Sequence, residues 1–173
     1  MSESSAECVP AFRMAREGAF RRGEIALSRL PRLTPLLCDD RGAARFELHF
    51  HLDSQSRPLL TGRVQATLDL LCQRCLETMT LELDLELRLG IVRSDEEAVA
   101  LSEDYEPLTL KTDTVSLAEL VEDELILGLP AAPLHPAGLC SPPVEAPAED
   151  GASAAGRLSE LGGVWRKARK RTE

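Results

Sequence analysis

Apolar and polar residues alternate with a period of two over much of the first half of the chain. The run ARFELHFHLD carries apolar side chains at every second position, and MTLELDLELRLGIV does the same with five leucines. Alternation of this kind places all apolar side chains on one face of a β-strand. It predicts three long strands and two short ones: Arg45–Leu52, Leu60–Leu71, Met79–Val92, Ile25–Leu27 and Leu108–Lys111.

Helical spacing is found in two segments. In VPAFRMAREGAFRRG the apolar residues suit a short helix that Gly18 weakens and Gly23 stops. In SLAELVEDELILGLP the hydroxyl of Ser116 can cap the helix and Glu119 stands at the capping-box position. Gly and Pro then end the segment, so a second helix is predicted over Ser116–Gly128.

Together these elements predict an α+β fold, in which one or two helices cover a twisted antiparallel sheet. We expect a single domain over residues 1–141 that includes the basic N-terminal segment. A Pro/Ala-rich, disordered linker over 142–156 and a flexible, basic C-terminal tail over 157–173 would follow. The apolar faces predict a core that contains Phe46, Leu48, Phe50, Val64, Leu68, Leu83, Leu85, Leu120, Val121 and Leu125.

Composition and the N-terminal sequence indicate the cellular compartment of the chain. No apolar run approaches the roughly 18 residues of a membrane span. The N-terminus MSESSAECVP lacks the basic and apolar regions of a signal peptide. Five cysteines in 173 residues, an odd number, also argue against a secreted disulfide framework. We therefore expect a cytoplasmic protein that does not contact a membrane.

Charge is segregated along the chain, whose formal net charge is −9. Residues 69–124 hold 16 acidic side chains against four basic ones, whereas residues 12–32 hold six arginines against two glutamates. The last ten residues hold five basic side chains against one glutamate. An acidic body with two basic ends indicates an electropositive contact made by the ends. The alternative is that these charges only solvate the surface.

The stretch LLCQRCLETMT contains a Cys-x-x-Cys pair, Cys72 and Cys75. A redox pair of this kind depends on a lowered thiolate pKa, usually at a helix N-terminus in a βαβ unit. Here the pair follows a strand, and the acidic neighbours are expected to raise the thiol pKa. No hydrolase, P-loop or HExxH motif accompanies it, and His49 and His51 lie on the polar face of a strand. We expect a protein that is not an enzyme and has no small-molecule substrate.

A metal site is a second interpretation of the pair. Zinc takes about four thiolate or imidazole ligands, and a Cys-x-x-Cys turn supplies two of them. The loop PLHPAGLC after the second helix supplies two more candidates, His135 and Cys140. The four would form a Cys3His zinc site if that helix packs back over the sheet. The alternative is that the pair only shapes a tight connection between two strands.

The C-terminal tail combines an aromatic ring with positive charge. Such a segment can stack on RNA bases and contact phosphates. The N-terminal arginines carry the other basic patch. The candidate residues for binding RNA or a partner are Arg13, Arg16, Arg21, Arg22, Trp165, Arg166, Lys167, Arg169, Lys170 and Arg171.

Three blocks of the sequence, in this order, resemble one bacterial family. They are FRMAREGAFRRGEIALSRLPRL, VQATLDLLCQRCLETM and VEDELILGLPAAPLHPAGLC. With the basic tail, they resemble the YceD-like large ribosomal RNA subunit accumulation factors. The resemblance implies a non-enzymatic factor for synthesis, processing or stability of 23S rRNA, and therefore for assembly of the large ribosomal subunit. It implies rRNA or a pre-50S particle as the partner.

Two features qualify what the resemblance implies. Many members of the family carry more cysteines after the LP-x-x-P segment, where this chain has His135 and Cys140 followed by SPP. A four-ligand metal site would therefore need the histidine. The acidic body also suits a different role, that of a protein-binding module that docks a basic ribosomal protein without contacting RNA directly.

Overall fold

The computed structural model describes residues 8–142 of the chain. Its main sheet has the strand order β2-β3-β4-β5-β6. The first four strands are antiparallel neighbours, and β6 runs parallel to β5. They are β2 (Phe20–Ala26), β3 (Ala43–Leu52), β4 (Pro58–Leu71), β5 (Thr78–Val92) and β6 (Glu106–Thr109). The fold is α+β, as predicted, but the sheet is mixed at one edge.

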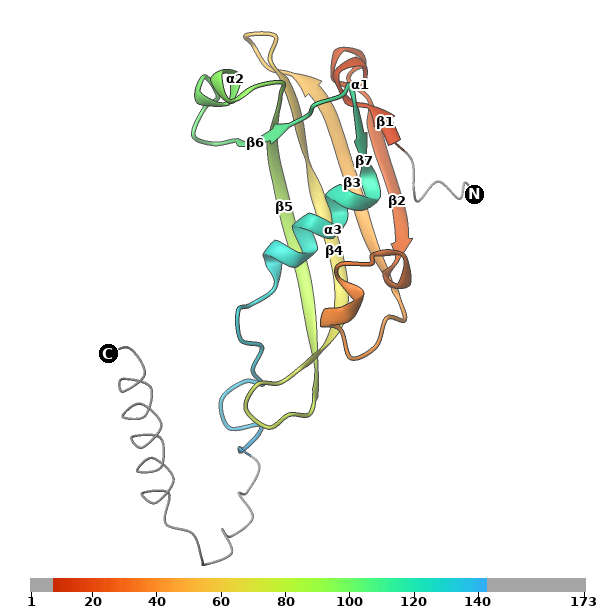
Figure 1. Cartoon of the computed structure of the whole chain (residues 1–173), viewed down its shortest axis with the longest axis vertical. Coiled ribbons are helices and arrows are strands. Elements are labelled where there is room, and N and C mark those ends of the chain that lie inside the picture. The colour runs from red at the N-terminus through yellow and green to blue at the C-terminus, as the bar shows by residue number, and fades with distance from the viewer. Residues whose placement is uncertain (1–7, 143–173) are drawn as a thin grey trace, which may run out of the picture. The chain divides into compact units, whose positions relative to one another are not determined.

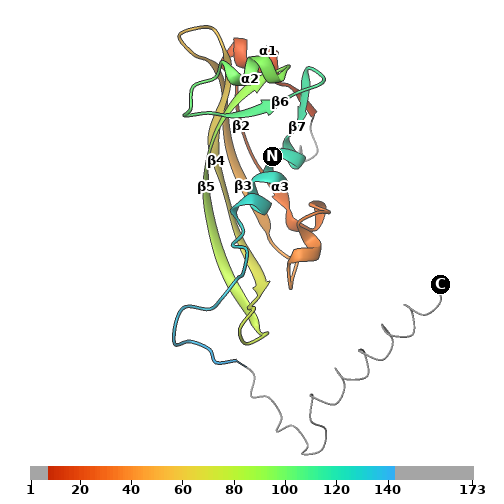
Figure 2. The ribbon, with the colours of Figure 1, turned by 60° about the vertical axis from the view of Figure 1, so that its left-hand side comes forward.

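The remaining elements are short, apart from one helix. Strand β1 (Cys8–Pro10) pairs with β7 (Thr114–Ser116) in a separate two-stranded sheet. The helices are α1 (Ala11–Glu17), α2 (Asp95–Val99) and α3 (Leu117–Gly128), and two 3₁₀ turns occupy Leu27–Arg29 and Thr34–Leu36. Figure 1 shows α3 crossing the long strands on one face of the sheet, with α1 and α2 at the end opposite the β4–β5 turn. The view in Figure 2 confirms that α3 lies on only one side of the strands.

The two faces of the sheet differ, as the alternation predicted. Strand β3 buries Phe46, Leu48 and Phe50 and exposes the residues between them. The β4 and β5 side chains follow the same rule, so one face carries the core and the other is open to solvent. All predicted core residues are buried except Leu83 and Leu85, which are half-buried against the core. They lie on β5 beside the sheet edge, where no other strand of the described residues covers them.

The N-terminal segment differs from its prediction. Helix α1 ends at Glu17 and does not continue to Gly23, because Gly18 takes a left-handed conformation at the helix end, with φ of 64°. Glycine adopts this conformation without steric cost and commonly ends helices. The chain then enters β2 at Phe20, five residues earlier than the predicted strand start at Ile25.

Helix α3 forms where it was predicted, with Ser116 as its cap. The backbone N–H of Glu119 donates to the Ser116 hydroxyl at 3.3 Å. At the other end, Gly128 lies against Leu85 of β5, and an added Cβ there would come within 2.8 Å of the leucine side chain. The missing side chain therefore lets the end of α3 approach the sheet closely. This contact directs the following loop along β5 towards the β4–β5 turn.

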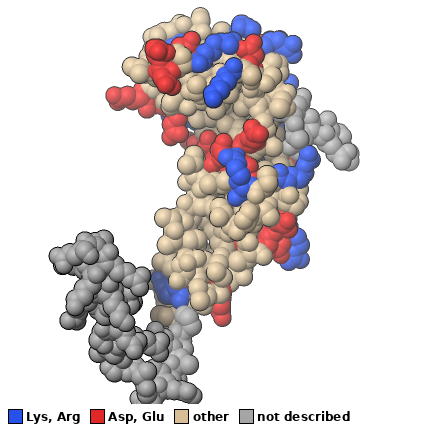
Figure 3. All heavy atoms as spheres, in the orientation of Figure 1, with Lys and Arg blue, Asp and Glu red and all other residues tan. Residues whose placement is uncertain are grey.

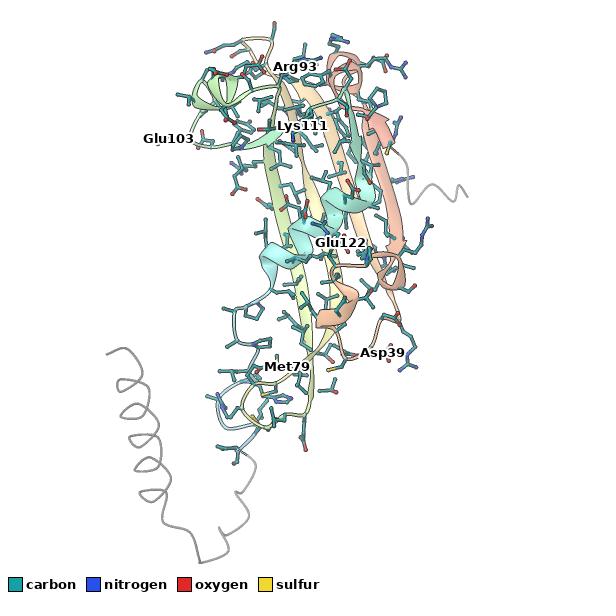
Figure 4. All side chains as sticks on the ribbon, viewed as in Figure 1. Asp39, Met79, Arg93, Glu103, Lys111 and Glu122 are labelled. Carbon is teal, nitrogen blue, oxygen red and sulfur yellow. The ribbon has the colours of Figure 1, made fainter. Side chains whose placement is uncertain are left out.

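Glu122 of α3 is a buried carboxylate that the sequence pattern did not reveal. Its oxygens accept the backbone N–H groups of Arg32 and Leu33 at 2.6 and 3.1 Å, and the Arg32 Nε at 2.9 Å. Figure 4 shows Glu122 between α3 and the segment that follows β2. The carboxylate thus accepts hydrogen bonds from backbone N–H groups of an irregular segment, which would otherwise lack acceptors.

The predicted linker over 142–156 and tail over 157–173 lie outside the described residues, apart from Pro142. The division of the chain at residue 142 stays a prediction. Each helix within residues 8–142 is too short or too polar to span a lipid bilayer.

Candidate metal centre

The β4–β5 turn holds the Cys-x-x-Cys pair. Cys72 follows the last residue of β4 and is fully buried, while Cys75 is half-buried. The Cys72 carbonyl accepts from the Leu76 N–H at 2.9 Å, and the Cys72 N–H donates to the Glu77 carbonyl at 2.9 Å. Leu76 has a φ of 61°, which is uncommon for a side chain of this size. The turn is therefore tightly closed, and it points both sulfurs to the same side.

The loop after α3 meets this turn, as Figure 1 shows at the end of β4 and β5. The backbone N–H of Gln73 donates to the Pro133 carbonyl at 2.8 Å, which joins the loop to the turn. A second contact follows, in which the His135 backbone N–H donates to the Cys72 sulfur at 3.4 Å. These two bonds bring together segments that are distant in the sequence.

All four predicted ligands lie together in this junction. Their donor atoms are within 4.8 Å of one another. The sulfurs of Cys72 and Cys140 are 3.9 Å apart, and the Cys75 sulfur is 3.3 Å from His135 Nδ1. The chain therefore contains a compact group of three thiols and one imidazole that can hold a metal ion.

The geometry fits zinc in particular. Tetrahedral zinc with Zn–S bonds of about 2.3 Å separates its sulfur ligands by roughly 3.8 Å, close to the observed 3.9 Å between Cys72 and Cys140. Thiolates and imidazoles are also the ligands that zinc prefers, and carboxylates are absent from the group. With four protein donors, no position would remain open for a substrate or water.

The electrostatics of the turn favour a thiolate at Cys72. Burial by itself raises the pKa of this thiol, but the backbone N–H groups of Cys75, His135 and Arg74 outweigh burial and lower the pKa to about 5. The expectation that acidic neighbours would raise it was wrong, because the nearby backbone dipoles act more strongly. Burial and the neighbouring Cys75 and Cys72 sulfurs raise the pKa of Cys140.

The predicted basic residues of the N-terminal segment are not gathered into one patch. Arg13 and Arg16 are exposed on α1, where Arg13 forms an ion pair with Glu17 at 3.5 Å. Arg21 and Arg22 alternate on β2, so their side chains leave opposite faces of the strand. The five basic residues of the tail and Trp165 lie outside the described part of the chain.

Arg57 and Arg93, which the sequence did not single out, lie near Arg16. The three side chains line a largely apolar cavity of about 550 Å³ at the α1 end of the sheet. The Arg93 guanidinium lies 4.1 Å above the centre of the Phe12 ring, and Figure 4 labels it beside α1. Both arginines stand at strand ends, and only the pairing of the strands brings them together.

Figure 3 shows that charged side chains concentrate at this end, whereas the visible surface near the metal-binding group carries few.

Comparison with known proteins decides the family. A family model described as "Large ribosomal RNA subunit accumulation protein YceD" matches residues 60–157. The chain belongs to the YceD family. A YceD protein of Haemophilus influenzae with the same description is 35% identical over 119 residues, which cover 68% of each chain. The YceD match includes the Cys-x-x-Cys turn, α3 and the loop with His135 and Cys140. No solved structure matches the chain.

Proposed function

We propose that this chain is a non-enzymatic factor that supports synthesis, processing or stability of 23S rRNA, and so assembly of the large ribosomal subunit. Its membership of the YceD family is the observation that carries the proposal, because the family is named for accumulation of the large ribosomal RNA subunit. The four-donor group supports the non-enzymatic part, since a metal held by four protein ligands has no open position for catalysis.

Contact with rRNA or a pre-50S particle would be made by the basic ends. The body between them is acidic and would repel a phosphate backbone. Arg13, Arg16 and Arg22 are exposed and near the N-terminal end of the described residues. The tail would add five cations and the ring of Trp165, which can stack on an unpaired base.

Zinc would serve the fold in this proposal. Bound by Cys72, Cys75, His135 and Cys140, it would fix the loop after α3 to the β4–β5 turn. The same junction leads directly into residues 143–173, which contain the tail. A bound metal would therefore fix the point at which the predicted linker over 142–156 leaves the described residues.

Depletion of the protein from the cells that make it tests the proposal. We expect the ratio of 23S to 16S rRNA and the 50S peak in sucrose gradients to fall, and the full chain to restore both. A variant without Val164–Glu173 should restore them only in part. A normal ratio and a normal 50S peak after depletion would refute the proposal.

A further inference from the structure

Strand β5 has an unpaired edge over much of its length. On one side it pairs with β4 along Thr78–Gly90. On the other side β6 pairs only with Leu89–Val92. Among the described residues, no strand pairs with that side of β5 between Thr78 and Arg88. Figures 1 and 2 show β6 meeting β5 only near the α2 end.

The orientation of the backbone groups on this edge follows from one hydrogen bond. The N–H of Leu110 donates to the Val92 carbonyl at 2.9 Å, so the backbone groups of Val92 point to the β6 side. Successive residues of a strand alternate in this direction, and the register with β4 runs without a bulge. The N–H and C=O groups of Glu82, Asp84, Glu86 and Arg88 therefore point out of the sheet at the unpaired edge.

Side chains along the edge divide into an acidic row and an apolar row. Glu82, Asp84 and Glu86 lie on the open face of the sheet. Leu81, Leu83 and Leu85 lie on the covered face, where they are only half-buried. Arg63 of β4 forms ion pairs with Asp84 at 3.0 Å and Glu86 at 3.7 Å, from the side away from the edge. Asp84 also accepts from Gln65 Nε2 at 3.1 Å, and Glu86 lies 3.9 Å from Arg88, so Glu82 is the acidic side chain of the row that has no ion pair among the described residues.

More acidic side chains stand where β6 begins. Glu106 is the first residue of β6, opposite Leu89. Glu124 of α3 is near enough that burial, Glu106 and Asp123 together raise its pKa. Paired residues of neighbouring strands share a face, so Glu106 lies on the covered face with Leu89. These carboxylates therefore lie beside the apolar row, not beside Glu82, Asp84 and Glu86.

We propose that the edge of β5 from Glu82 to Arg88 binds an extended basic segment of another protein as an added β-strand. Such a segment would alternate Lys or Arg with apolar residues. Its cations would lie opposite Glu82, Asp84 and Glu86, and its apolar side chains would complete the cover over Leu81, Leu83 and Leu85. Main-chain hydrogen bonds to the outward backbone groups would supply affinity, and the two side-chain rows would supply specificity.

Charge argues against the other occupants of this edge. A second copy that paired through the same edge would place two acidic rows opposite each other, which is destabilising. RNA would meet the same carboxylates. This inference goes beyond the proposed function, because it requires neither RNA contact by the basic ends nor a bound metal.

A labelled peptide, Lys-Val-Lys-Val-Lys-Val-Lys, tests the proposal by fluorescence anisotropy with the full chain. A matched peptide with every backbone nitrogen methylated keeps the charge and side chains but cannot donate hydrogen bonds from its backbone. We expect the first peptide to bind and the second to bind at least tenfold more weakly. Equal binding of both would mean simple charge attraction and would overturn the proposal, as would no binding.

Two variants of Glu82 and one control variant locate the peptide on the protein. Glu82→Pro removes an N–H that points out of the sheet and leaves the β4 ladder intact, so it should weaken binding at least tenfold while circular dichroism stays unchanged. Glu82→Gln should weaken it severalfold, whereas Glu47→Gln, on the same face but on β3, should not. Unchanged peptide binding by Glu82→Gln would contradict the proposal. So would the finding that the chain forms a dimer that Glu82→Pro dissociates. If Glu82→Pro does not fold, the methylated peptide and Glu82→Gln still test whether the peptide binds this edge.

Discussion

The sulfurs of Cys72 and Cys140 lie 3.9 Å apart, although 68 positions separate the two residues in the sequence. One belongs to a turn between two strands, and the other to a loop after the last described helix. Neither element alone holds more than two of the four donors. The metal-binding group therefore exists only when α3 has packed on the sheet and directed its loop to the turn, so metal binding and folding of this end should be coupled.

Metal content is the first prediction. We expect purified protein to contain about one zinc per chain by elemental analysis. Cys140→Ser and His135→Ala should each lower the content and reduce the melting temperature, because a ligand that binds only the folded state stabilises it. Cys38→Ser is the matched control, since Cys38 is an exposed thiol outside the group. Purified protein without zinc, or an equal loss of zinc in the Cys38→Ser control, would mean that Cys72 and Cys75 only shape the turn.

Glu122 gives a second prediction. Glu122→Ala removes the acceptor for the Arg32 and Leu33 backbone N–H groups, and should lower the free energy of unfolding by about 2–4 kcal/mol. Glu122→Gln keeps one acceptor oxygen and should cost less. Asp123→Asn alters the exposed ion pair with Arg32 and should cost less than about 1 kcal/mol. Urea denaturation measures all three, and similar losses for Glu122→Ala and Asp123→Asn would contradict the account of the buried carboxylate.

Leucines of β4 and β5 should respond differently to truncation. Leu68→Ala removes a fully buried side chain and should cost about 2–5 kcal/mol. Leu85→Ala should cost about 1–2 kcal/mol, since that side chain is only half-buried beside the unpaired edge. Equal losses in urea denaturation would mean that something covers Leu85 in solution.

Deletion of Val164–Glu173 tests the tail. We expect the melting temperature of the body to stay nearly unchanged, because residues 8–142 form a hydrophobic core of their own. Binding to rRNA or pre-50S particles should weaken, and the slope of log K against log salt should flatten by up to about 0.7–0.9 for each phosphate that the tail neutralises. An unchanged affinity and slope would show that the tail only adds solubility.

The long strands and α3 could be predicted because their periodic patterns run over many residues. The strands β1 and β7 could not, since three residues show no period. The parallel direction of β6 also escaped prediction, because it depends on how the α2 segment returns to the sheet.

The four metal ligands could be chosen by chemical type, but only the path of the loop after α3 shows that they meet. Glu122 reads as one more acidic residue of an amphipathic helix, and its burial depends on the backbone of a distant segment.

The proposed function requires the chain to contact 23S rRNA or its precursor particle. Ultraviolet crosslinking in cells, followed by purification of the tagged full chain and sequencing of the attached RNA, measures this contact directly. We expect enrichment of 23S rRNA or its precursor over 16S rRNA, and a marked loss of this enrichment when Val164–Glu173 is deleted. Recovery of protein partners with no enrichment of 23S rRNA would contradict the claim and favour the acidic body as a docking module for a basic ribosomal protein.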